Sequence, residues 1–93
     1  MLAQFPIDLS KVSKENLDKE ILRLGMIAEL DAVSLYEQLA DATDNPNIKE
    51  VLLDIGKEEK VHIAEFKTML DKMDQEQVDM DKKGSDEVKE MIG

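Results

Sequence analysis

Glu59 and His62 are the residues of this sequence whose types and spacing best suit chemistry. Residues three apart on a helix are neighbours on one face, so this carboxylate and the only histidine can share a ligand. They interrupt a seam, at alternating steps of three and four, whose other members are apolar: Leu52, Ile55, Phe66, Met69 and Met73. Because an unpaired carboxylate and imidazole are costly to bury, a bound metal is the commonest reason for placing them there.

Glu29 is the matching acid on a second seam with the same alternation. That seam carries Leu22, Gly25, Ala32, Tyr36 and Leu39. If a turn lies near residue 45, Glu29 precedes it by 16 residues and Glu59 follows it by 14. Two antiparallel helices would therefore bring both carboxylates to nearly the same height, which predicts one site.

The predicted ligands are half of those that a di-iron carboxylate bundle uses. Di-iron carboxylate bundles use a Glu from each of two helices and a Glu-x-x-His from each of two others. One copy of this chain offers one Glu and one Glu-x-x-His, so two copies about a two-fold axis would complete the set. Carboxylate and imidazole ligands suit iron, manganese or zinc, and this ligand set favours iron.

Several side chains have a second interpretation. Glu58, His62 and Glu65 also share a stripe, and if that stripe faces water His62 is a solvated histidine between two acids. Tyr36 is either a core aromatic or a hydrogen-bond donor to a ligand carboxylate. Asp31 is either solvated or part of a cation route, and Met26, Met69 and Met73 are interpreted as core filler.

Composition restricts the class of protein and of partner. The chain has 93 residues, 3% aromatic and 37% charged residues, and a formal net charge of −10. This charge argues against nucleic acid and anionic membranes as partners. The absence of cysteine excludes disulfides, thiolate ligands and iron–sulfur clusters. No run suits a membrane span and the first residues lack the layout of a signal peptide, so we expect a cytoplasmic location.

The elements that must position the site are long amphipathic helices. We expect one all-α domain over residues 1–93, with helices over 14–41 and 46–73 and a short helix over 86–91. Ser13 is the predicted N-cap of the first helix, and Asp44 or Asn45 caps the second, which Pro46 opens. Gly84 and Ser85 are expected to break the chain before the last helix. The connection near residue 45 is so short that the two long helices must form an antiparallel hairpin.

Two stretches of the hairpin resemble the encapsulated ferritins, short ferritin-like proteins of encapsulin nanocompartments. These are Ala28-Glu29-Leu30-Asp31-Ala32-Val33, with Tyr36-Glu37-Gln38 after it, and Glu58-Glu59-Lys60-Val61-His62. The end of the chain, Val88-Lys89-Glu90, is similar to archaeal members fused to the shell protein. The resemblance implies a homodimer that completes a ferritin-like four-helix bundle, within a ring that is typically a decamer.

The same resemblance implies roles for particular residues. Glu29, Glu59 and His62 match ligands of a di-iron ferroxidase centre at the dimer interface, and Tyr36 matches a tyrosine beside it. Asp31 matches one acid of an iron-uptake site, whereas Ala28 stands where another acid would be.

The function expected from residues and resemblance together is oxidation of Fe(II) by O2, which would feed iron storage inside an encapsulin shell. The alternatives are a rubrerythrin- or manganese-catalase-like peroxide enzyme and a metal-free structural dimer.

Overall fold

The computed structural model describes residues 8–93, and within them all regular structure is helical. A 3-10 turn, η1 (Leu9–Lys11), precedes three α-helices: α1 (Leu17–Ala42), α2 (Pro46–Met73) and α3 (Gln75–Ile92). The predicted all-α class is therefore confirmed. The expected domain starts at residue 1, but residues 1–7 lie outside the described part. None of the helices in residues 8–93 combines the length and apolarity that a membrane span needs.

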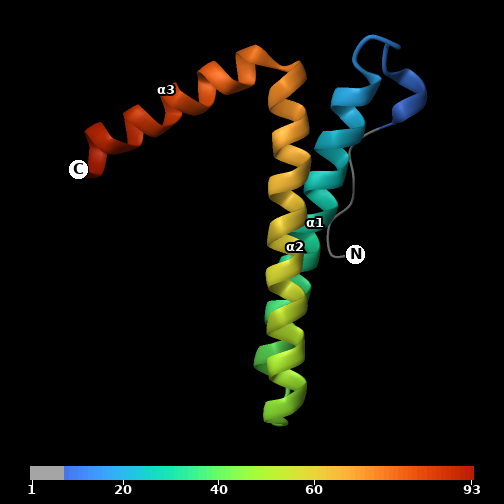
Figure 1. Cartoon of the computed structure of the whole chain (residues 1–93), viewed down its shortest axis with the longest axis vertical. Helices are drawn as coiled ribbons and strands as arrows, with labels where there is room; N and C mark the ends of the chain where they lie inside the picture. Colours follow the sequence, from blue (N-terminus) through green and yellow to red (C-terminus); the bar gives the residue numbers. More distant parts are fainter. Residues whose placement is uncertain (1–7) are drawn as a thin grey trace.

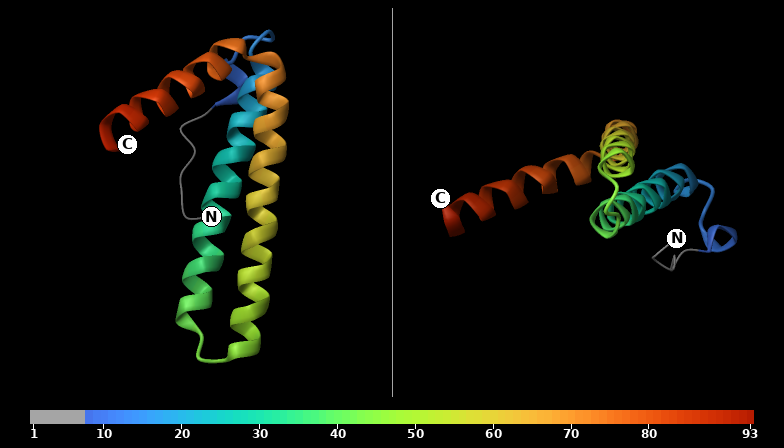
Figure 2. Two further views of the ribbon diagram at one scale, coloured as in Figure 1. Left: turned by 60° about the vertical axis from the view of Figure 1, so that its left-hand side comes forward. Right: turned by 90° about the horizontal axis from the view of Figure 1, so that it is seen from below.

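α1 and α2 form the predicted antiparallel hairpin. They lie side by side along the long axis of the molecule in all views, joined by a turn at residues 43–45 (Figures 1 and 2). Asn45 caps α2 by accepting hydrogen bonds from the backbone N–H groups of Asn47 and Ile48, at 2.9 and 3.2 Å. Pro46 takes the first helical position, where its missing N–H costs nothing. The bounds of α2 are those that the sequence predicts.

Small residues let the two helices of the hairpin approach closely. A Cβ added to Gly25 of α1 would lie 3.0 Å from the ring of Phe66 of α2, so the ring packs directly on the α1 backbone. Lower in the hairpin, a Cβ on Gly56 of α2 would contact Cβ of Tyr36 of α1 at 3.7 Å. Glycine at residue 25 therefore fixes how near Phe66, one turn beyond His62, can come to α1.

α1 begins three residues later than the sequence predicts. Residues 14–16 form a turn, and Asn16 is the N-cap residue of the helix. The expected cap, Ser13, instead accepts a hydrogen bond at its hydroxyl from the Asn16 side-chain amide, at 3.1 Å. Its oxygen is therefore occupied by a side chain rather than by the N–H groups of a first helical turn.

α3 is a single helix from Gln75 to Ile92, so the predicted break at Gly84 and Ser85 is wrong and the helix expected over 86–91 starts earlier. A glycine inside a helix lowers the stability of the helix by about 1 kcal/mol, which does not prevent the helix from forming. A side-chain ion pair from Lys82 to Asp86, at 2.7 Å, spans the glycine. This i,i+4 pair adds some support to the helix at that point.

Two ion-pair clusters connect α3 to the hairpin, from which it turns away at Asp74 (Figure 1). Asp74 caps α3 by accepting from the Gln77 N–H, and its other oxygen accepts from Arg23 at 3.1 Å; Arg23 also pairs with Glu20 at 2.7 Å. Asp74 is nearly buried, with a side chain 10% exposed. These contacts fix the point where the chain changes direction.

The second cluster is centred on Lys67 of α2. Its ammonium group donates to Asp71 at 2.7 Å and to Asp81 of α3 at 2.5 Å. The hydrogen bonds to Asp71 and Asp81 raise the pKa of Lys67 above its ordinary value. The hydrogen bonds from Lys67 and then Gln77 lower the pKa of Asp81. α3 buries no residue of its own, so these polar contacts are a large part of what holds it in place.

Candidate metal centre

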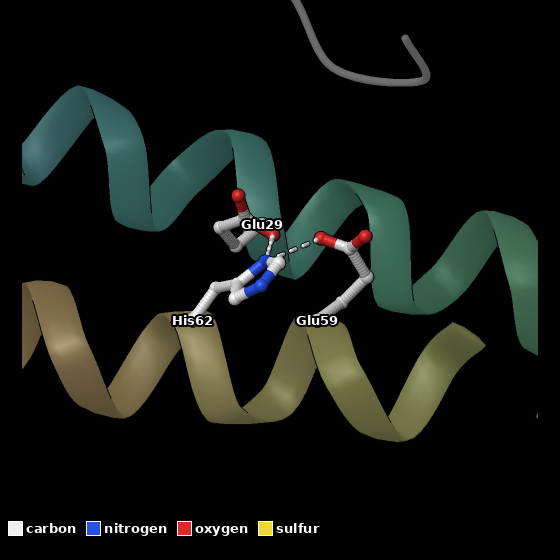
Figure 3. A group of neighbouring side chains, drawn as sticks. All are labelled: Glu29, Glu59 and His62. Carbon is white, nitrogen blue, oxygen red and sulfur yellow. Dashed lines mark hydrogen bonds and ion pairs between the residues drawn. The ribbon is translucent and has the colours of Figure 1, made fainter. Parts of the chain in front are cut away.

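Three side chains converge between α1 and α2 near the middle of the hairpin. Figure 3 shows Glu29 reaching from α1, and Glu59 and His62 from α2, with their polar ends turned toward one another. The imidazole Nδ1 of His62 lies 3.3 Å from Oε2 of Glu29 and 3.4 Å from Oε2 of Glu59. These are the residues predicted from the register of the two seams, and the structure brings them together.

The helical spacing of α2 determines which of its acids joins the group. Glu59 is three residues before His62 and its side chain is 19% exposed, whereas Glu58 is exposed. Glu29 is similarly shielded, with a side chain 20% exposed. His62 remains 45% exposed, so one side of the imidazole is open. Glu58 therefore lies on the solvent side of the helix, and the shielded carboxylates of Glu29 and Glu59 are the ones that face His62.

The donor atoms of the three residues lie close enough together to approach one metal ion. One carboxylate oxygen from each Glu and one imidazole nitrogen lie within 4.8 Å of one another. First-row metals bind such oxygen and nitrogen atoms at about 2.0–2.2 Å, which puts neighbouring ligands roughly 3.0–3.5 Å apart. The two separations to Nδ1, 3.3 and 3.4 Å, fall in this range. Without a metal, the contact between Nδ1 of His62 and Oε2 of Glu29 is a long hydrogen bond.

The centre opens onto a groove along one face of the hairpin. The groove has a volume of about 330 Å³ and is lined by Leu22, Glu29, His62, Glu65, Phe66 and Met69. Three ligands leave a transition metal short of the four to six that it usually takes. A metal held by these three residues would therefore need further ligands, and a second surface that covers the groove could supply them.

The other two predicted site residues, Asp31 and Tyr36, lie on α1. Both residues are half-buried, and Asp31 is not among the carboxylates of the metal-capable cluster found in residues 8–93. The Tyr36 side chain begins beside Gly56 of α2, so it lies at the helix contact below Glu59. Their assignment to the site stays a prediction.

Sequence reasoning did not assign Met69 and Glu65 to the groove. Met69 was interpreted as core filler, yet its side chain is 49% exposed and lines the groove with His62. Met69 lies on the seam two turns after His62. In a single copy that position is equally compatible with the core and with the groove. Glu65, one turn after His62, lies at the edge of the same groove.

Comparison with known proteins adds a family and two relatives. The Rubrerythrin family model matches residues 20–91. The chain is 51% identical, over 81 residues and 87% of its length, to a ferritin-like–encapsulin shell fusion protein of Pyrococcus furiosus. It is 39% identical, over 71 residues and 73% of its length, to an encapsulin nanocompartment cargo protein of Myxococcus xanthus. The chain spans 23% of the first relative and 55% of the second.

A solved structure has the same fold. The crystal structure of an encapsulated ferritin domain from Pyrococcus furiosus matches with a TM-score of 0.85 and 44% sequence identity. The match covers all of this chain and 97% of the other. It therefore includes α3 as well as the hairpin and the cluster of Glu29, Glu59 and His62.

Proposed function

The chain belongs to the Rubrerythrin family of ferritin-like proteins, and from this premise we propose that it oxidises Fe(II) to Fe(III) with O2 at a di-iron site shared between two copies. The observation that carries the proposal is the cluster of Glu29, Glu59 and His62 on an open groove. It combines the ligand types of a di-iron carboxylate centre with half the ligand number.

Two copies packed groove to groove supply the missing half. Such a dimer contains four Glu and two His ligands, the complement of a di-iron carboxylate bundle. It also covers the apolar side chains that one copy leaves half-exposed along the groove, among them Leu22, Phe66 and Met69. A two-fold interface is self-complementary, so one surface serves both copies. Two hairpins together make the expected four-helix bundle.

Each residue of the cluster has a definite task in this proposal. The carboxylates of Glu29 and Glu59 bind the incoming Fe(II) and stabilise the higher charge of Fe(III). This lowers the reduction potential of the Fe(III)/Fe(II) couple, so Fe(II) is easier to oxidise. His62 would bind through Nδ1, the ring nitrogen that faces both carboxylates. Phe66 and Leu22 limit water at the centre. Bound iron supplies the electrons for O2 reduction.

The two relatives indicate a compartment in which this activity could take place. One relative is a fusion with an encapsulin shell and the other is a cargo protein of an encapsulin nanocompartment. We propose that this chain likewise works inside an encapsulin shell in the cytoplasm, as a dimer within a ring-shaped, decameric assembly. Tyr36 is proposed to lie beside the assembled centre and Asp31 on the path by which iron reaches it.

The test is anaerobic loading with Fe(II) followed by exposure to air, with Fe(III) absorbance recorded at increasing iron per chain. The matched variants are Glu59→Ala and Glu58→Ala, which remove the same group one residue apart, from the cluster and from the solvent side. In wild type and Glu58→Ala we expect fast oxidation of Fe(II) that saturates at about one iron per chain. In Glu59→Ala we expect this oxidation to be lost. Equal, buffer-like rates in all three proteins would contradict a ferroxidase.

The family match also favours a second candidate, reduction of hydrogen peroxide at the same ligands. Turnover of hydrogen peroxide, compared with turnover of Fe(II) and O2 on the same preparation, separates the two. A metal-free structural dimer predicts instead that Glu29→Ala and His62→Ala leave assembly unchanged or improved, since each removes a polar group from the contact between the copies. Sedimentation of both variants with and without Fe(II), in the absence of O2, distinguishes this case.

A further inference from the structure

The methionines of the described chain differ in their relation to the metal centre. Five of the six methionines lie within residues 8–93: Met26, Met69, Met73, Met80 and Met91. Among these five, Met69 is the one that lines the groove with Glu29 and His62. Met26 lies in a separate groove with Leu30 and Leu70. Met91, near the end of α3, is 77% exposed.

Met69 is also oriented toward the centre by the geometry of α2. It follows His62 by seven residues, two helical turns, so both lie on one face about 10 Å apart along the axis. Long side chains on a helix lean toward its N-terminus, which here is the direction of Phe66 and His62. A small molecule that leaves the centre along the groove therefore passes the Met69 thioether.

We propose that Met69 is a built-in oxidation site, converted to the sulfoxide by hydrogen peroxide formed when the centre oxidises iron. The inference rests on the proposed function. Two Fe(II) ions each give one electron to O2, which takes up two protons and leaves as hydrogen peroxide. The Met69 sulfur then attacks the peroxide: an S–O bond forms, the O–O bond breaks, sulfur loses two electrons and water is released.

Position rather than exposure decides which methionine reacts with peroxide formed at the centre. Peroxide added to the solution meets Met91 first, because its side chain is the more exposed. Peroxide produced at the centre has its highest concentration in the groove, and Met69 is there. The two sources therefore predict opposite orders of oxidation for the same two residues.

Oxidation at Met69 has a consequence for assembly. The sulfoxide is polar, whereas its neighbours in the groove, Leu22 and Phe66, are apolar. Placing a polar group without a partner in a contact between two copies weakens that contact. A chain that has turned over many times thus loses its dimer and, with it, the shared centre.

The sequence makes the experiment direct. Trypsin cuts after Lys67 and Lys72 and releases Thr68–Lys72, whose one methionine is Met69; the peptide Glu90–Gly93 contains Met91 alone. Wild-type protein is given repeated additions of Fe(II) in air, with Fe(III) formation recorded, and sulfoxide is quantified in both peptides by mass spectrometry. Catalase is present in half of the samples to destroy peroxide that reaches the solution.

We expect at least about five-fold more sulfoxide at Met69 than at Met91, unaffected by catalase, and the reverse order when hydrogen peroxide is added without iron. Glu59→Ala should lose the Met69 signal. After the same turnovers, Met69→Leu should keep the assembled mass that wild type loses, because leucine fills a similar volume without the reactive sulfur.

Iron oxidation without preferential sulfoxide at Met69, or a Met69 signal abolished by catalase, would overturn this inference and leave the ferroxidase proposal standing. Failure to oxidise iron at all would overturn both.

Discussion

Replacing each of three helical glycines by alanine tests whether the hairpin contact is as tight as the structure shows. Alanine is the better helix former by about 1 kcal/mol, so each substitution has the same gain. The surroundings differ. A Cβ at Gly84 meets nothing within 4 Å, at Gly56 it makes an ordinary 3.7 Å contact, and at Gly25 it lies 3.0 Å from two atoms of the Phe66 ring.

The expected order of stability follows from these distances. Gly84→Ala should stabilise α3 by about 1 kcal/mol. Gly56→Ala should be close to neutral or slightly stabilising. At Gly25 the ring must move by some tenths of an ångström, and overpacking of this kind costs about 1–3 kcal/mol, which leaves a net loss of about 0–2 kcal/mol. The difference between Gly25→Ala and Gly84→Ala is therefore about 1–3 kcal/mol.

Thermal unfolding followed by circular dichroism measures the global effect, where 1 kcal/mol is about 4–8 °C for a domain of this size. All proteins are compared at one concentration, because self-association adds stability. Hydrogen exchange read by mass spectrometry reports α3 and the hairpin separately, so a gain confined to α3 is still seen. If Gly25→Ala is stabilised as much as Gly84→Ala, Phe66 does not pack on α1 as described.

The remaining predictions concern the caps and ion pairs. Arg23→Met should destabilise the protein by about 1–3 kcal/mol in urea unfolding, because it leaves the shielded Asp74 carboxylate without its cation. Asp74→Asn should cost less, because the asparagine oxygen still accepts the hydrogen bond from the Gln77 N–H. A larger loss for Asp74→Asn than for Arg23→Met would contradict this role of Arg23. Asn45→Ala should cost about 1 kcal/mol in the same assay through loss of the α2 cap, and no change would argue against it. Because Lys67 lowers the pKa of Asp81, that carboxyl adds stability above its unfolded pKa, and the stability is lost as pH falls through the lower folded value. Lys67→Met should therefore remove part of the acid dependence of α3 hydrogen exchange below pH ~4, whereas an unchanged acid profile would count against the pair.

The hairpin and the three-residue cluster could be predicted because local signals and the tertiary structure agree. The caps at Asn45 and Pro46 and the alternating seams specify two antiparallel helices, and their register brings Glu29 level with Glu59. The resemblance to encapsulated ferritins is confirmed by the family and structural matches. Whether the cluster binds iron stays a prediction.

The sequence predicts only a short last helix, over residues 86–91, because residues 74–83 are polar and acidic and carry a weak helical pattern, whereas α3 begins at Gln75. Asp74 followed three residues later by Gln77 is the spacing of a capping box, and Asp74 does accept from the Gln77 N–H. Gly84 does not break α3, because one glycine costs only about 1 kcal/mol and the pair from Lys82 to Asp86 spans it. The link from Arg23 to Asp74, 51 residues apart, has no local signal at all.

α3 behaves as a lever arm with its pivot at Asp74. With 18 residues the helix is about 27 Å long, so a rotation of about 5° at the pivot displaces Ile92 by about 2 Å. That displacement is large enough to separate two apolar side chains in contact. How closely the exposed Val88, Met91 and Ile92 keep their place relative to the hairpin therefore depends on two ion-pair clusters near the other end of the helix. Small losses of polar contact there are magnified along the arm.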